Sequence, residues 1–192
     1  MNKKYKLKRK AKRKDNNMNK KYELTDETKE IGGITLHRIR ALMDISRYGA
    51  RAGDTGGWIE AESNLSQYGN AWVSDDARVY GNAVVYGNAV VCGDARVYGE
   101  ALVNGNAEVS GNAEVKSIRD YAVFKNGWSS ARWFTYTRSN RMWRVGCFHG
   151  TGEELTAKAY KDSELSGKCY EAIVRAQEAI DRAIDEKEGD TK

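Results

Sequence analysis

The chain has 192 residues, of which 40% are hydrophobic and 31% are charged, and its formal net charge is +5. These proportions are typical of a globular domain, and no apolar stretch approaches the roughly 20 residues of a membrane-spanning helix. Three scattered cysteines without a CxxC pair exclude a disulfide framework and a cysteine-based metal site. We therefore expect a protein of the bacterial cytoplasm with no membrane partner.

Positive charge is concentrated at the start of the chain. Residues 1–21 carry eleven Lys and Arg against one acidic residue, which leaves 21 basic and 26 acidic residues for the remainder. We expect this segment to be a disordered basic tail, with weak contact to nucleic acid as the functional alternative. MNKKY occurs at residues 1–5 and again at residues 18–22, which makes Met18 a second candidate start of translation.

Residues 22–56 are expected to form an N-terminal cap. Thr35 is a suitable N-cap for a short helix that carries Leu36, Ile39 and Leu42 on one face. Such a helical cap would cover the first coil of the repeat that follows, because an uncovered sheet edge tends to pair with other chains.

Residues 57–124 contain a six-residue repeat in which Ala is followed two residues later by Val, usually after a Gly-Asn or Gly-Asp pair. Residues two apart in an extended segment point to the same face, so Ala and Val should point inward and the residue between them outward. Gly followed by Asn permits the positive φ angles of a turn. The pairs are Ala71 and Val73, Ala77 and Val79, Ala83 and Val85, Ala89 and Val91, Ala95 and Val97, Ala101 and Val103, Ala107 and Val109, and Ala113 and Val115.

This pattern resembles the hexapeptide repeat of left-handed parallel β-helices, in which three hexads form one triangular coil. The resemblance implies a mainly β fold, namely a short left-handed parallel β-helix of about three coils. Residues eighteen apart should then stack on the outside, which predicts columns of Trp72 with Val90, Arg78 with Arg96, Tyr80 with Tyr98, and Tyr68 with Tyr86.

Residues 125–192 have a different pattern and should form a C-terminal hairpin-helix module. RWFTYT and RMWRVGCF alternate and are joined by RSN, which predicts a β-hairpin. Thr151 and Glu154 form a capping box, so a helix should follow as far as about Lys161.

A longer helix is expected from Gly167 to Lys187, with Ser166 as its N-cap. Its apolar residues recur at three- and four-residue spacing, which predicts one packing face. The face would pack on the hairpin or, as the alternative, on a partner helix, and it consists of Ile173, Ala176, Ile180 and Ala183.

The order of the segments carries a second resemblance. TLHRIRAL, AGDTGGWIEAESNLSQYGNAWV, the Gly-Asn-Ala-x-Val repeats and RVGCFHGTGEEL resemble a family of small phage and prophage proteins, over residues 18–175. This resemblance implies a β-helix with a C-terminal α/β module and a viral origin, but no particular activity.

Enzymatic function has weak support in the sequence. Hexapeptide β-helices include acyltransferases with a catalytic histidine, but His37 and His149 lie outside the repeat, and Cys147 with His149 has no evident third catalytic group. We therefore predict that the chain is not an enzyme and has no catalytic, cofactor-binding or metal-binding residues. A hexapeptide-repeat acyltransferase remains an alternative.

The favoured hypothesis is a phage-derived protein that binds a host or viral protein and blocks it, for instance a bacterial defence factor. Binding would use the β-helix and the C-terminal module, and a homo-oligomer is compatible with it. The alternatives are nucleic-acid binding through the tail and a structural role in the virion. Exposed aromatic and Arg side chains are the usual anchors of interfaces. The candidate anchors are Trp72, Arg78, Tyr80, Tyr86, Arg96, Tyr98, Trp143 and Arg144.

Overall fold

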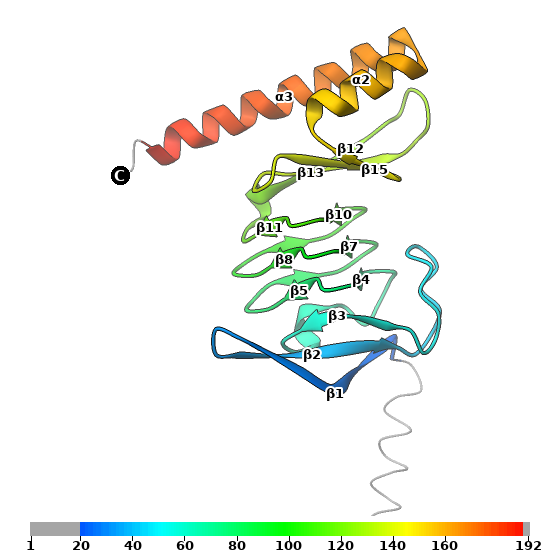
Figure 1. The fold of residues 1–192 in the computed structure, drawn as a ribbon, viewed down its shortest axis with the longest axis vertical. Coiled ribbons are helices and arrows are strands. Elements are labelled where there is room, and N and C mark those ends of the chain that lie inside the picture. Colours follow the sequence, from blue (N-terminus) through cyan, green and yellow to red (C-terminus); the bar gives the residue numbers. More distant parts are fainter. Residues whose placement is uncertain (1–19, 190–192) are drawn as a thin grey trace, which may run out of the picture.

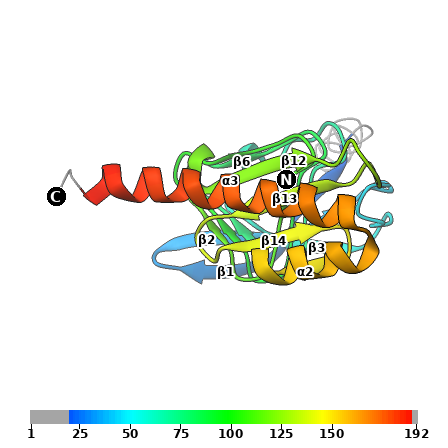
Figure 2. The ribbon, with the colours of Figure 1, turned by 90° about the horizontal axis from the view of Figure 1, so that it is seen from above.

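The computed structural model describes residues 20–189, which form a column of β-coils with a cap at each end (Figure 1). The fold is mainly β, and its two α-helices lie side by side across the C-terminal end of the column (Figure 2). Among these residues no helix is both long and apolar enough to cross a membrane. The predicted disordered tail and the second start at Met18 fall almost entirely outside the described part of the chain.

The hexads stack into about three coils, and each hexad adds one short strand to one of three faces. Strands eighteen residues apart pair in parallel, as Arg78 does with Arg96 and Trp72 with Val90. This confirms the predicted period, while the handedness stays a prediction. The strands are β4 (Trp72–Val73), β5 (Arg78–Val79), β6 (Val84–Val85), β7 (Val90–Val91), β8 (Arg96–Val97), β9 (Leu102–Val103), β10 (Glu108–Val109) and β11 (Glu114–Val115).

The repeat Ala and Val side chains fill the inside of the column. All sixteen residues predicted to point inward are fully buried, and they belong to one hydrophobic cluster. Burial of each Val contributes about 1.5–3 kcal/mol, and a single coil has too few of them to be stable alone. The predicted inward phase is therefore confirmed.

Below the regular hexads, the lowest coil departs from the period. It contains β3 (Thr55–Ile59) and a 3-10 turn, η1 (Glu62–Asn64). Trp58 of β3 pairs with Arg78 of β5, and Leu65 pairs with Val85, so both steps span twenty residues. Two additional residues are therefore accommodated after Leu65, in the turn that leads to Ala71.

The N-terminal cap is a β-hairpin, so the predicted helix at Thr35 is wrong. Strand β1 (Tyr22–Ile31) pairs antiparallel with β2 (Ile34–Ala41), and β2 pairs antiparallel with β3. The spacing of Leu36 and Ile39 fits a helix, but β-branched residues favour a strand. A strand at this position also pairs with the open edge of β3, which a helix cannot do because its backbone groups bond to one another.

The folded part of the chain begins before residue 22. Lys21, which the sequence placed in the disordered tail, is buried, and its Nζ donates a hydrogen bond to the carbonyl of Ala71 at 2.7 Å. Lys20 forms an ion pair with Glu62 at 2.6 Å. The predicted tail therefore extends two residues too far.

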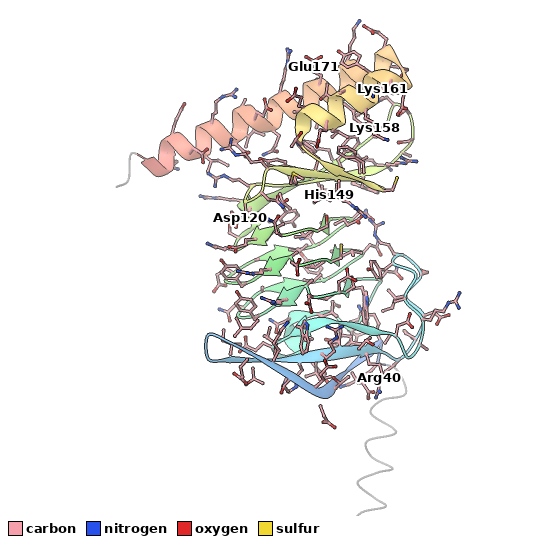
Figure 3. The ribbon with its side chains drawn as sticks, in the orientation of Figure 1. Arg40, Asp120, His149, Lys158, Lys161 and Glu171 are labelled. Carbon is pink, nitrogen blue, oxygen red and sulfur yellow. The ribbon has the colours of Figure 1, made fainter. Side chains whose placement is uncertain are left out.

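The C-terminal cap starts with a four-stranded antiparallel sheet. The predicted hairpin is confirmed as β13 (Trp133–Thr137) and β14 (Met142–Val145), and β12 (Tyr121–Lys125) and β15 (Phe148–Gly150) flank it. Residues 121–124 thus belong to this sheet and not to the β-helix. A 3-10 turn, η2 (Ile118–Asp120), connects the last coil to β12, and Asp120 and His149 lie where the two parts meet (Figure 3).

Side-chain hydroxyls of this sheet and its hairpin turn form one hydrogen bond with each face of the last coil. Thr135 accepts a hydrogen bond from the N–H of Glu108 at 2.8 Å, and Ser139 accepts one from the N–H of Glu114 at 2.7 Å. On the third face the Tyr121 hydroxyl donates to the carbonyl of Leu102 at 2.8 Å. These hydrogen bonds pair backbone groups that would otherwise lack partners at the end of the stack.

Two helices complete the cap. The helix α2 (Gly152–Asp162) begins at the predicted capping box, in which Thr151 accepts from the N–H of Glu154 at 3.2 Å. The helix α3 (Glu164–Gly189) begins three residues earlier than predicted, and Ser163, not Ser166, accepts a hydrogen bond at its start. Gly167 does not mark a helix start. It lies within the helix, where a Cβ would be 2.1 Å from the ring of Tyr160.

The packing face of α3 also differs from the prediction. Val174, Gln177 and Asp181 are buried, whereas Ile180 and Ala183 are exposed. The helix therefore turns a partly polar face to the sheet, and its C-terminal end extends beyond the column (Figure 2).

Candidate functional site

Four of the eight predicted anchors come together on one side of the column. Arg78 and Arg96 are neighbours on β5 and β8, and Tyr80 and Tyr98 follow them in the adjoining turns. The spacing of eighteen residues brings equivalent side chains together, because each coil repeats the position of the one below. We call Arg78, Tyr80, Arg96 and Tyr98 the Arg–Tyr ladder.

The tyrosines of the ladder form a parallel stack. The ring centroids of Tyr80 and Tyr98 are 5.1 Å apart and their planes differ by 6°. Lys116, the next residue in this column, has its Nζ 5.4 Å from the Tyr98 centroid, and the Tyr98 hydroxyl donates to Glu114 at 3.1 Å. Partial burial, followed by the neighbouring Tyr98, raises the pKa of Tyr80. The stack is thus held in place at its Tyr98 end, and Tyr80 stays uncharged at neutral pH.

The two arginines of the ladder differ in their exposure and in their polar contacts. Arg96 is exposed and forms an ion pair with Glu114 at 3.2 Å. Arg78 is half-buried, and its Nε is buried without a hydrogen-bond partner among the described residues. Because this Nε is inaccessible, an acidic partner would have to contact the rest of the Arg78 guanidinium, a group that is suited to carboxylates.

More basic side chains continue this side of the column below the ladder. Trp58 is buried beneath Lys29 and Arg38, which lie 5.0 and 4.9 Å from its ring. The Trp58 indole donates to Asp76 at 3.1 Å, and this hydrogen bond, followed by the charge of Lys29, lowers the pKa of Asp76. Sequence reasoning missed these residues, because Trp58 is two residues out of phase and Arg38 lies in the segment expected to be a helix.

Two predicted anchors are buried, and their assignment as exposed binding residues is wrong. Trp72 stacks with Val90 as predicted but is only 1% exposed. Its ring meets Tyr22 edge-on at 6.5 Å, and a loop over residues 42–54 crosses this face, where Arg47 donates to the carbonyl of Asn106 at 3.2 Å. Trp143 is 2% exposed because it lies between the sheet and the helices, 5.0 Å from the ring of Tyr136.

The remaining two anchors lie apart from the ladder. Arg144 forms an ion pair with Glu108 at 2.6 Å, which links the C-terminal sheet to the last coil. Tyr86 is exposed at another edge, one coil above Tyr68, and accepts a hydrogen bond from Asn104 at 2.9 Å. The structure therefore gives Arg144 a structural contact and leaves Tyr86 on a separate surface.

The histidines and Cys147 are dispersed over the molecule. His37 lies on β2 opposite Ile59, and His149 lies on β15 opposite Arg144. Cys147 is exposed in the turn between β14 and β15. Within residues 20–189 no group of three His, Cys, Asp or Glu side chains could hold a metal ion. Whether the chain catalyses a reaction stays a matter of prediction.

Comparison with known proteins supports the fold. The sequence model of a family described as YdcK Beta solenoid repeat matches residues 77–93, which contain the hexads of Ala77, Ala83 and Ala89. No curated protein matches the chain. The matched hexads and the parallel pairing of their strands together establish a β-solenoid repeat protein.

Proposed function

We propose that this chain is a phage-derived, non-enzymatic protein that binds a host or viral protein in the bacterial cytoplasm and blocks it, for instance a defence factor. The observation that carries the proposal is the Arg–Tyr ladder. It combines two ring-stacked tyrosines, an exposed arginine and a half-buried arginine on one rigid surface.

The composition of the ladder is that of an interface anchor. Tyr and Arg are over-represented among the residues that dominate binding energy at protein interfaces, whereas the surrounding contacts contribute little. The ladder is also pre-organised, since Arg78 and Arg96 extend from paired strands and Tyr80 packs on Tyr98. Less side-chain entropy is lost when such groups bind a partner.

Charge indicates what kind of partner the ladder fits. Lys29, Arg38, Arg78, Arg96 and Lys116 lie along this side of the column, and Asp76 and Glu114 neutralise part of their charge. An acidic protein surface with carboxylates around an apolar centre would complement it. A phage origin is supported by the resemblance of the segment order to small phage proteins.

The proposal is tested by identifying the partner and then measuring its affinity for variants. The partner is captured from bacterial lysate with tagged protein, purified and titrated by calorimetry. We expect Arg78→Ala and Tyr98→Ala each to weaken binding by about 1–3 kcal/mol, as true anchors do. Arg51→Ala is the matched control, because Arg51 is exposed on the loop at another side of the column.

Circular dichroism must show that the variants keep their fold, since Tyr98 packs on Tyr80. If both ladder variants bind the purified partner as tightly as Arg51→Ala does, the ladder is not the binding surface. Loss of biological activity in His149→Ala with normal folding and normal binding would instead indicate an enzyme.

A further inference from the structure

The C-terminal module contains a hollow that the ladder does not line. A cavity of about 260 Å³ lies between the sheet and α3. Pockets for small molecules usually have volumes of about 300–1,000 Å³, so this cavity would take a small ligand. Its lining residues are Tyr136, Arg141, Trp143, Gly152, Val174, Gln177, Glu178, Asp181, Arg182 and Asp185.

Asp181 is a buried carboxylate in this lining. It is 6% exposed and accepts hydrogen bonds from the Tyr136 hydroxyl and from Gln177 Nε2, the latter at 3.0 Å. Both donors are neutral, and the nearby ion pairs of Arg138 and Arg141 are made with Asp185. A buried charge is stabilised most by a cation at hydrogen-bond distance.

Gln177, which also lines the cavity, has an unused acceptor. The residue is also 6% exposed, and its Oε1 is buried without a hydrogen-bond partner in the described part of the chain. A buried acceptor that is left unpaired costs about 1–3 kcal/mol. A ligand that donates hydrogen bonds to Gln177 and Asp181 together would remove this cost and compensate the carboxylate charge.

The remaining lining defines the shape of such a ligand. The rings of Tyr136 and Trp143 are 5.0 Å apart with their planes at 45°, and they give the cavity an aromatic wall. Glu178 and Asp185 add carboxylates, Arg182 adds an exposed cation, and Arg141 forms an ion pair with Asp185 at 3.6 Å. Aromatic faces beside carboxylates favour a flat cation over a compact one.

We propose that the cavity beneath α3 binds a small alkylguanidinium compound, whose planar N–H donors reach Asp181 and Gln177 while its flat face packs on Tyr136 and Trp143. Guanidinium presents several donors in one plane, which matches two acceptors on successive turns of one helix. This inference is independent of the Arg–Tyr ladder and of any protein partner.

The test uses the full chain and two probes of the same shape. Butylguanidine carries the cation, and butylurea is its neutral counterpart. We expect saturable binding of butylguanidine by calorimetry, and binding of butylurea that is roughly tenfold weaker or worse, because hydrogen bonds to a charged group contribute about 1.5–3 kcal/mol. Equal binding of the two probes, or no saturable binding of butylguanidine at millimolar concentration, would overturn the proposal.

Variants locate the site. Asp181→Asn should weaken butylguanidine binding roughly tenfold, whereas Glu186→Gln, an exposed position on the same helix outside the lining, should leave it unchanged. Unchanged binding in a folded Asp181→Asn protein would place the ligand elsewhere. Should Asp181→Asn fail to fold, Gln177→Met takes its place, and the two probes on the unaltered protein still decide the question.

A third probe separates two sources of the guanidinium. Arginine blocked at both its amino and carboxyl groups represents the side chain of a polypeptide. Tighter binding of blocked arginine than of butylguanidine would assign the cavity to an Arg side chain of a protein and overturn the small-molecule source. Weaker binding supports a free small molecule.

Discussion

Gly69 and Gly105 occupy the same turn position in different coils, with φ angles of 70° and 65°. A side chain at either position would be strained, because L-residues rarely adopt this conformation. Only Gly69 has a coil stacked directly against it, and a Cβ there would lie 2.6 Å from the carbonyl oxygen of Gly87. At Gly105 nothing lies within 4 Å. The pair therefore separates backbone strain from stacking.

We predict that Gly105→Ala lowers the free energy of unfolding by about 1–2 kcal/mol, the cost of the left-handed conformation alone. Gly69→Ala should cost about 1–3 kcal/mol more, because the coils must move apart locally. Urea unfolding followed by circular dichroism measures both. Equal losses for the two variants would contradict the close stacking of these turns.

At the scale of the strand, a charged side chain should be tolerated at outward-facing positions of the repeat but not at inward-facing ones. Val91 is fully buried in the column, whereas Val84 points outward and is half-buried. We predict that Val91→Asp abolishes soluble folded protein, because its carboxylate would be buried without a partner. Val84→Asp should fold, with a loss of stability below about 2 kcal/mol. Solubility and circular dichroism distinguish them, and equal behaviour would refute the inward phase.

A feature could be predicted when the residues that cause it are close in the sequence, and it could not when they are far apart. The inward phase of Ala and Val follows from residues two apart, and the capping box of α2 from residues three apart, so both were predictable. Burial of Trp72 was not, because the loop over residues 42–54 and Tyr22 cover it from a distant part of the sequence.

The same difference in sequence separation explains why the Arg–Tyr ladder could be predicted and the cavity beneath α3 could not. Arg78, Tyr80, Arg96 and Tyr98 were predicted to stack because the period alone brings them together. The cavity beneath α3 was not foreseen, since the Ile and Ala spacing of the helix indicated an apolar face. Hydrogen bonds of Asp181 with Tyr136 and Gln177 instead orient a polar face inward.

At the scale of the whole molecule, stability should depend on pH through groups buried in both the N-terminal cap and the column. Burial lowers the pKa of Lys21 to about 8 and raises the pKa of Cys92 to about 11. Between pH 8 and 9 the unfolded chain keeps its Lys21 proton more readily than the folded chain does. Stability should therefore rise with pH in this window, by up to about 1 kcal/mol per pH unit.

Above pH 9 other groups make the folding stability fall as the pH rises. The unfolded chain then loses the Cys92 proton, and nearer pH 10 the protons of Tyr22 and Tyr136, whose pKa values burial raises in the folded state. We predict a stability maximum near pH 9 in urea unfolding, and a rise between pH 8 and 9 that disappears in Lys21→Met. A variant that retains the full rise would show that Lys21 is not its source.

The column also sets the geometry between its two ends. Three faces share the coil, and both ends are closed, by the hairpin below and by the hydroxyls of Thr135, Ser139 and Tyr121 above. Loss or gain of one hexad would place the C-terminal module over a different face, turned by one third of a revolution. Only changes of three hexads would preserve its orientation and alter the separation of the ends by one strand spacing, about 4.8 Å. The molecule can therefore vary in length only in whole revolutions if the cavity and the ladder are to keep their relative directions.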